Sequence, residues 1–121
     1  MAPTDILGAV TLEELSARQR AFSEARAWGP WHTPKNLVMA LTGEVGELTE
    51  LFQWLTPEEA ATAADDPALR PRIDDELADV LLYLVRLADV LGVDLIEAAN
   101  AKIDRNETRF PPGVGRTALE K

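Results

Sequence analysis

The chain contains no cysteine and a single histidine, His32. The absence of cysteine excludes disulfides, iron–sulfur clusters and thiol nucleophiles. No apolar run approaches the about 20 residues that a membrane-spanning helix needs. No apolar segment follows a basic stretch near the N-terminus, as it would in a signal peptide. We therefore expect a cytoplasmic protein that has no membrane partner.

Basic residues are also scarce. The chain has 12 Lys and Arg against 21 Asp and Glu, for a net charge of −9. Proteins that track a nucleic-acid backbone need clustered basic side chains, so we expect no nucleic-acid partner. The excess of acids is compatible with a substrate whose own negative charge is bound together with a metal ion.

Length and helix signals predict one all-α domain. The 121 residues fit a single domain. We expect it to cover residues 1–121, to be ordered from about residue 10 to 111, and to end in a loose tail at 112–121. No segment shows the alternation of apolar and polar residues that is typical of a strand. The expected fold is an antiparallel helical bundle of four main helices and a short one.

Capping and breaking residues place these helices along the chain. Thr11 and Glu14 form a capping-box pattern, and we expect the first helix to run to about Trp28 because a Gly-Pro pair follows. Pro71 is expected in a loop. The other helices are expected after Thr33, after Thr56 for the short one, from about Arg72 to Leu91, and from Asp94 to about Arg109.

Two pairs of acids have a spacing suited to metal binding. Glu44 and Glu47 lie three residues apart, as do Glu76 and Asp79, so each pair shares a helix face. Glu44 falls inside an apolar stripe, which places these acids at a seam between helices. Like charges about 4 Å apart repel by about 4 kcal/mol at an effective dielectric of about 20, so a cation or a proton must compensate. Oxygen ligands favour Mg²⁺ or Mn²⁺.

Three further points bear on the interpretation of these acids as a metal site. A single Glu-x-x-Glu pair is most often a solvated acidic face, and a di-iron site needs two Glu-x-x-His motifs, which one histidine cannot supply. Gly43 and Gly46 bracket Glu44 inside its helix, at a cost of about 1 kcal/mol each relative to alanine. They would allow a neighbouring helix or a ligand to approach closely.

Several longer motifs are also present. They are Gly43–Leu48, Phe52–Trp54 and Asp75–Tyr83, together with Trp28, His32, Pro34 and Asn36, and with Lys102, Asp104, Asn106 and Arg109. Taken together, these motifs resemble the MazG-like all-α nucleoside-triphosphate pyrophosphatases, and within them the dCTP pyrophosphatase branch. The resemblance covers roughly residues 12–111.

The resemblance implies a site, a reaction and an assembly. It implies that the four acids are Mg²⁺ ligands and that a nucleoside triphosphate is hydrolysed to the monophosphate and pyrophosphate. A dimer or a dimer of dimers is expected, and the resemblance favours the tetramer. Vertebrate members carry a substrate-contacting histidine where this chain has Gln19, which can still donate and accept hydrogen bonds. The implied base and sugar contacts are Trp28, Gly29, Pro30, Trp31, His32 and Trp54.

Other side chains extend the predicted site. Trp54 would be a stacking platform for the base, or else a core residue. Tyr83 shares the helix face of the second acid pair and would bond a phosphate, or else lie in the core. Lys102, Asn106 and Arg109 share one face of the last helix as a triphosphate clamp, or else form a solvent face.

The predicted chemistry is metal-assisted attack of water on a phosphoanhydride. Glu47 or Glu50 would orient or deprotonate that water, and attack at the α or the β phosphorus stays open. We expect dCTP or a 5-modified dCTP as the substrate, in nucleotide-pool sanitation. Pyrophosphate is the expected product, because no P-loop for γ-phosphate transfer exists.

Two rival interpretations stay open. The helix at 72–91 is apolar around well over half its circumference, which indicates self-association. Leu81, Leu82 and Val85 would be exposed in a monomer, so we expect a homo-oligomer. The same feature is compatible with a non-enzymatic helical self-association module. The second rival is a phosphoribosyl-ATP pyrophosphohydrolase-type enzyme.

Overall fold

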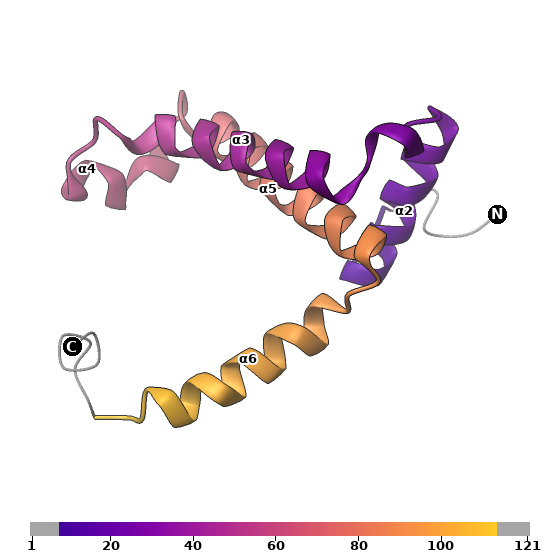
Figure 1. Ribbon diagram of the computed structural model, residues 1–121. Helices are drawn as coiled ribbons and strands as arrows, with labels where there is room; N and C mark the ends of the chain where they lie inside the picture. The colour runs from indigo at the N-terminus through magenta and orange to yellow at the C-terminus, as the bar shows by residue number, and fades with distance from the viewer. Residues whose placement is uncertain (1–7, 114–121) are drawn as a thin grey trace. The chain divides into compact units, whose positions relative to one another are not determined.

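The computed structural model describes residues 8–113, and these residues form helices and connections without a strand (Figure 1). The predicted all-α class, with four long helices and a short one, is confirmed. The chain divides into two units, Met1–Leu91 and Gly92–Lys121, and a single domain stays a prediction. Nearly all of the predicted tail lies outside the described residues. Within those residues no helix has the length and apolar character needed to cross a membrane.

Helix α2 (Leu12–Ala25) begins where its cap predicts. The Thr11 hydroxyl accepts a hydrogen bond from the Glu14 backbone N–H at 3.1 Å. The Glu14 carboxylate bonds back to the N–H of Val10 at 2.8 Å. One free N–H group of the first helical turn, that of Glu14, is therefore satisfied, and the Glu14 side chain also holds the residue before the cap.

The end of α2 differs from the prediction, because the helix stops three residues before Trp28. Ala27 adopts a left-handed conformation with φ 54°. Its N–H donates to the carbonyl of Glu24 at 3.1 Å, and the Trp28 N–H donates to the carbonyl of Ser23 at 3.0 Å. This pair of bonds is a Schellman motif, in which glycine usually holds the left-handed position. The Gly-Pro pair lies instead in a short 3₁₀ helix, η1 (Gly29–Trp31).

The next two helices start with threonine caps followed by proline. Helix α3 (Pro34–Phe52) is capped by Thr33, whose hydroxyl accepts from the Asn36 N–H at 3.3 Å. Helix α4 (Pro57–Ala61) has a complete capping box, because Thr56 and Glu59 bond each other's backbone N–H at 3.1 and 2.9 Å. A 3₁₀ helix, η2 (Ala63–Asp65), follows.

Helix α5 (Arg70–Leu91) begins two residues earlier than predicted. Pro71 therefore lies in its first turn and not in a loop. Proline is tolerated there because a first-turn N–H has no partner within the helix. Gly92, with φ +70°, follows the end of the helix. In the second unit, helix α6 (Leu95–Arg109) is capped by Asp94, which accepts from the Glu97 N–H at 2.9 Å.

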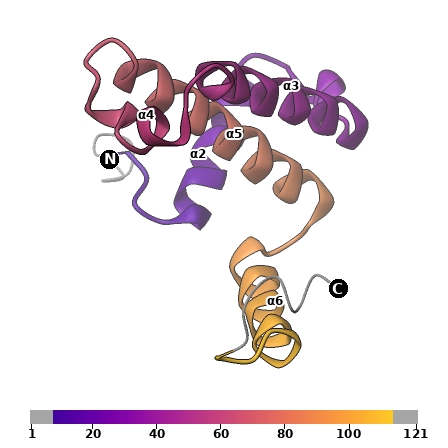
Figure 2. The same cartoon turned by 90° about the vertical axis from the view of Figure 1, so that its left-hand side faces the viewer.

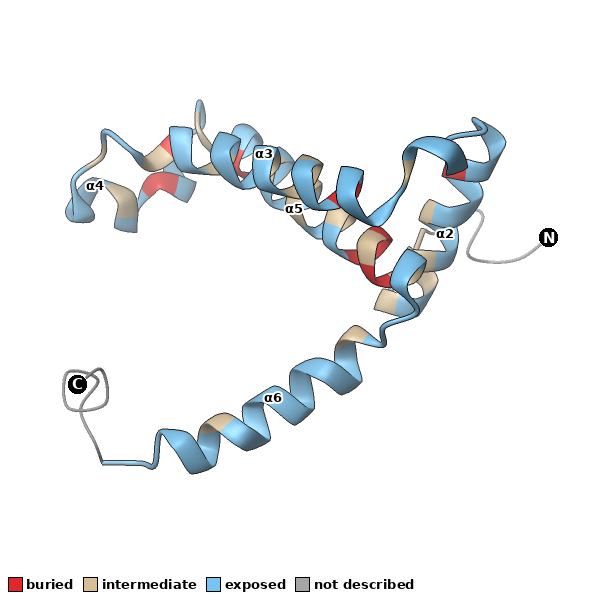
Figure 3. Cartoon of the chain, viewed as in Figure 1, coloured by how far each residue is buried: buried red, intermediate tan, exposed pale blue. Residues whose placement is uncertain are grey.

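In the first unit, α3 and α5 lie side by side and run in opposite directions in both views, and α2 packs against α5 (Figures 1 and 2). Few residues are fully buried (Figure 3). Val85, expected on the surface of a monomer, is only 2% exposed and Leu82 is half-buried, whereas Leu81 is 41% exposed. The buried apolar residues are Leu37, Leu51, Ala63, Ile73, Val85 and Ala88.

Candidate functional site

Three of the four predicted acids meet where α3 and α5 pack together. One carboxylate oxygen from each of Glu44, Glu47 and Glu76 lies within 4.8 Å of the other two. The antiparallel packing of the two helices brings the α5 acid against the α3 pair. Asp79, one turn further along α5, is not a member of this close group, although its charge acts on Glu44. We call Glu44, Glu47 and Glu76 the carboxylate cluster.

The acids of the carboxylate cluster repel one another, and burial further disfavours their charged forms. The pKa of Glu44 is raised to about 7, first by burial and then by the adjacent Glu47, with smaller contributions from Asp79 and Glu76. The pKa of Glu76 is also raised, first by burial and then by Glu47. The Oε2 atoms of Glu44 and Glu76 are buried and have no hydrogen-bond partner among the described residues.

Unpartnered buried carboxylate oxygens are costly unless something positive pairs with them. A divalent cation would satisfy both orphaned oxygens at once. The donor set consists of oxygens alone, which fits a hard ion such as Mg²⁺ or Mn²⁺ and not a thiolate-seeking metal. The residues present therefore fit the predicted metal.

A cavity of about 490 Å³ opens between α2, α5 and the residues that flank η1. Its lining contains the predicted substrate residues Gln19, Trp28, His32 and Tyr83, together with Asp79, which is predicted both to bind the metal and to contact the substrate. Asp79 lies one helical turn after Glu76, so it connects the cavity to the carboxylate cluster. A ligand in this cavity would have the cluster close to one end.

The side-chain amide of Gln19 has a defined orientation in the cavity. Its Nε2 donates to the backbone carbonyl of Leu82 on α5 at 2.9 Å. Its Oε1 is buried and has no partner among the described residues. Because one N–H of the amide is bonded to α5, the orientation of the amide is set, and its oxygen is left to accept a hydrogen bond from a ligand.

An aromatic group forms another wall of the cavity. The ring of Trp28 meets that of Phe22 edge-on at 5.5 Å and that of His32 at 5.8 Å, measured between centroids. The left-handed turn at Ala27 directs the chain from α2 into this wall. The residues of η1 follow in sequence, but Trp31 is 70% exposed and does not line the cavity.

The sequence analysis missed Arg86. Its Nε donates to Nδ1 of His32 at 3.0 Å, and its Nη1 donates to Asp89 at 2.9 Å. Asp89 is also held by Arg20, through contacts of 2.6 and 3.0 Å. A signal existed, because Arg86 interrupts the apolar run of α5 and has an acid three residues later.

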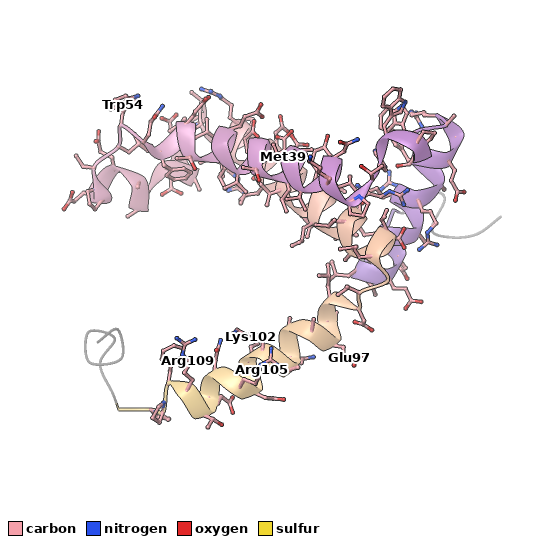
Figure 4. The ribbon with its side chains drawn as sticks, viewed as in Figure 1. Met39, Trp54, Glu97, Lys102, Arg105 and Arg109 are labelled. Carbon is pink, nitrogen blue, oxygen red and sulfur yellow. The ribbon has the colours of Figure 1, made fainter. Side chains whose placement is uncertain are left out.

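Some predicted residues lie apart from the cavity and the carboxylate cluster. Trp54 follows the helix end at Phe52, so it does not extend the face of Glu47, and it is 86% exposed (Figure 4). Glu50 is exposed and outside the cluster. At Gly43 and Gly46 an added Cβ would meet nothing within 4 Å, so no neighbouring helix in the described residues approaches them.

The predicted phosphate clamp lies on α6, in the second unit. Lys102 and Arg109 are exposed, and Asn106 is half-buried. Arg105 adds a further cation along the same helix (Figure 4). The Arg109 guanidinium lies 4.9 Å from the ring centroid of Phe110. Their contact with a substrate stays a prediction.

Comparisons with known proteins agree with this arrangement. The model of the MazG-like family matches residues 40–115. Bovine dCTP pyrophosphatase 1 is 44% identical over 106 residues, which cover 88% of this chain and 63% of that protein. A dATP/dGTP diphosphohydrolase of Cyanophage S-2L is 34% identical over 103 residues, covering 82% of this chain and 76% of that protein.

A solved pyrophosphatase from Archaeoglobus fulgidus is also similar. It has a TM-score of 0.78 and 38% identity, and the match covers 85% of this chain and 94% of that one. The chain spans less than two thirds of the length of the bovine relative. The family model nevertheless covers more than half of the chain, and both relatives align over most of it. On this evidence the chain belongs to the MazG-like family.

Proposed function

We propose that this protein is a Mg²⁺-dependent nucleoside-triphosphate pyrophosphohydrolase that releases a nucleoside monophosphate and pyrophosphate. The observation that carries the proposal is the carboxylate cluster, with its two orphaned buried oxygens. Asp79 connects this cluster to a cavity of about 490 Å³. The names of the bovine, phage and archaeal relatives support the same class of reaction.

Glu44, Glu47, Glu76 and Asp79 would hold the Mg²⁺, and Mn²⁺ is the alternative ion. When bound, such an ion neutralises phosphate oxygens and lowers the pKa of a coordinated water. Glu47 is exposed beside the two half-buried acids, so its free oxygen can orient or deprotonate the attacking water. Glu50, three residues later on α3, is the alternative base.

The cavity favours a base that carries an amino group. The orphaned Gln19 Oε1 accepts a hydrogen bond, and cytosine presents an exocyclic N–H₂ at its edge. Thymine and uracil present an oxygen at that position, which would face the Gln19 oxygen without a proton between them. Buried polar groups left unpaired reject a wrong substrate strongly. We therefore propose dCTP or a 5-modified dCTP as the substrate.

Adenine also carries an amino group, and the relatives differ in the bases that their names give. Family membership alone therefore does not decide the base. Stacking on Trp28 tolerates any base, and so would stacking on Trp31 or Trp54. The preference for a pyrimidine over a purine rests on the higher identity of this chain to the bovine dCTP pyrophosphatase 1 than to the phage dATP/dGTP diphosphohydrolase.

The remaining parts of the proposal concern the rest of the molecule. Tyr83 lines the cavity and would bond the phosphates, while Lys102, Asn106 and Arg109 would clamp them from α6. The assembly would be a tetramer arranged as a dimer of dimers, which would cover the apolar residues exposed on α5. A cytoplasmic location stays a prediction.

The test is to incubate the purified protein with Mg²⁺ and dCTP, dTTP or dATP, and to separate the products by ion exchange. We expect dCMP and pyrophosphate, with dCTP turned over fastest. Diphosphate together with orthophosphate would contradict the reaction. Equal turnover of the three substrates would contradict the base preference and leave the reaction standing.

A paired substitution tests the metal ligands. Glu44→Gln keeps the size of the side chain and removes a ligand charge, so turnover should fall by at least about tenfold, as metal-site changes commonly cause. Mg²⁺ should raise the melting temperature of the unchanged protein, because it binds the folded state alone, and should raise that of the variant less. Glu58→Gln, an exposed change on α4, is the matched control and should alter neither.

A further inference from the structure

The imidazole ring of His32 is hydrogen-bonded at Nδ1 and has no partner among the described residues at Nε2. It lines the cavity beside Gln19 and Trp28. Its backbone N–H bonds the carbonyls of Trp28 and Gly29 at 3.1 and 3.2 Å, and the edge-on contact with Trp28 fixes the tilt of its ring. Nδ1 accepts from Arg86, whereas Nε2 has no bond from any described residue. The free edge is therefore the one left for a ligand.

Arg86 determines which ring nitrogen carries the proton. The side chain is nearly buried, at 9% exposed. A guanidinium does not lose its protons in proteins and has no acceptor. Its Nε is thus always a donor, and the Nδ1 atom that it meets at 3.0 Å must present a lone pair. A neutral imidazole has one N–H, which consequently lies on Nε2.

The surroundings also disfavour the doubly protonated ring. Burial lowers the pKa of His32, and the positive charge of Arg86 lowers it further. The one acid of this network, Asp89, is bonded to Arg20 and Arg86 and not to the imidazole. Its charge is therefore paired with two guanidinium groups.

We propose that Arg86 is a positioning residue that holds His32 as the Nε2–H tautomer, so that His32 donates a hydrogen bond to an acceptor atom of the nucleotide in the cavity. The tautomer itself is independent of any activity, whereas the contact with a nucleotide rests on the function proposed above. His32 Nε2 then acts as a hydrogen-bond donor beside Gln19 Oε1, which acts as an acceptor. Neither group can exchange its role while Arg86 and Leu82 hold the opposite ends.

The first experiment measures the tautomer directly. Because His32 is the only histidine, a long-range ¹H–¹⁵N spectrum of the labelled protein at neutral pH contains one imidazole. We expect a protonated Nε2 and a lone-pair Nδ1 in the free, unsubstituted protein. A protonated Nδ1, or a ring averaged between both forms, would overturn the proposal, whatever any variant does.

Substitution of Arg86 separates positioning from simple support of the fold. In Arg86→Met the Nδ1 restraint is lost, so the ring should show both tautomers. Arg20→Met is the matched control, because it removes a partner of Asp89 and leaves the Arg86–His32 bond in place; its imidazole spectrum should match that of the unsubstituted protein. A loss of the tautomer in both variants would show that the ion-pair network, and not Arg86, holds the ring.

Kinetics with dCTP and Mg²⁺ test the contact. Loss of an oriented hydrogen bond should raise KM for Arg86→Met by about threefold to tenfold, with kcat little changed, while Arg20→Met keeps the original KM. The same comparison with dideoxy-CTP, which lacks the 3′-hydroxyl, locates the acceptor. A lost KM effect places the acceptor at the 3′-hydroxyl, and a persisting effect places it elsewhere on the nucleotide.

An equal rise in KM for both variants would contradict the positioning role. A protein that does not hydrolyse dCTP but shows the Nε2–H tautomer would overturn the proposed function. In that case the contact with a nucleotide would fall with it, and the assignment of the tautomer to Arg86 would stand.

Discussion

Asp89 takes part in an ion pair that joins α2 to α5. It accepts from Arg20 on α2 and from Arg86 on its own helix. The pKa of Asp89 is held below its usual value, first by the Arg20 hydrogen bond. The folded state therefore gains stability from the ionised carboxylate above the unfolded pKa, and that gain is lost as the pH falls through the lower folded pKa.

Asp89→Asn should lower the free energy of unfolding at pH 7 by about 1–3 kcal/mol, as expected for bonds between charged groups. The difference from the unsubstituted protein should shrink as the pH is lowered into the acid range, because the native carboxylate then becomes protonated too. Urea unfolding at a series of pH values measures both effects.

Asp74→Asn is the control for a generic loss of acid. The Arg70–Asp74 pair has a similar distance of 2.8 Å, but both side chains are more than half exposed, at 58% and 57%. Exposed pairs contribute about 0.5 kcal/mol or less. Equal losses of unfolding free energy in Asp89→Asn and Asp74→Asn would show that the ion pairs of Asp89 stabilise the fold no more than an exposed pair does.

Single residues also show where sequence reasoning reaches its limit. Glu44 and Glu47 were predicted to meet Glu76 because spacing along a helix is a local property, visible from the intrusion of acids into apolar stripes. The Arg86–His32 bond joins residues 54 positions apart. Nothing local distinguishes such an arginine from one that extends to solvent, so its partner could be found only from the folded structure, in which the residue after η1 meets α5.

Among the elements, starts were predicted better than ends. Thr11, Thr33, Thr56 and Asp94 all cap the helices expected of them. A cap acts within three residues, so its pattern can be read from the sequence. The end of α2 could not be, because Ala27 occupies a left-handed position that ordinarily requires glycine.

Ala27→Gly tests the strain at that end. The left-handed conformation costs a non-glycine residue roughly 1–2 kcal/mol, and the greater freedom of glycine in the unfolded chain offsets part of the gain. The substitution should raise the free energy of unfolding by up to about 1 kcal/mol, measured by urea denaturation.

Ala21→Gly, inside α2, is the matched control. It should lower stability by about 1 kcal/mol, because glycine is a poor helix former. If Ala27→Gly destabilised the protein to the same extent, the left-handed turn before Trp28 would not exist in solution.

The apolar surface of the first unit concerns the whole molecule. Leu77, Leu81 and Leu84 on α5 are 51%, 41% and 39% exposed. A groove of about 490 Å³ beside them is lined by Val45, Leu48, Phe52 and other residues of α3 and α5. Of the three leucines, Leu77 also lines this groove, and exposed apolar patches mark interaction sites in soluble proteins.

We expect light scattering at micromolar concentration to find a homo-oligomer, and Leu81→Glu to shift it to a smaller species, because a charge cannot be buried there without a partner. Val10→Glu is the control, since Val10 is 82% exposed and precedes α2, and it should leave the assembly intact. A stable monomer before any substitution would contradict the expectation.

Helix α5 carries two of the four proposed metal ligands, Glu76 and Asp79, together with a wall of the cavity and Arg86, without a break in the helix. Glu76 and Tyr83 are seven residues apart, so at about 1.5 Å per residue their separation along the axis is about 10.5 Å. Inserting or deleting one residue between them would turn everything beyond it by about 100°. Homologues should therefore vary in length in the loops before Arg70 and after Leu91. They should have no insertion or deletion within residues 76–86, because the helical repeat sets the distances between the site residues on α5.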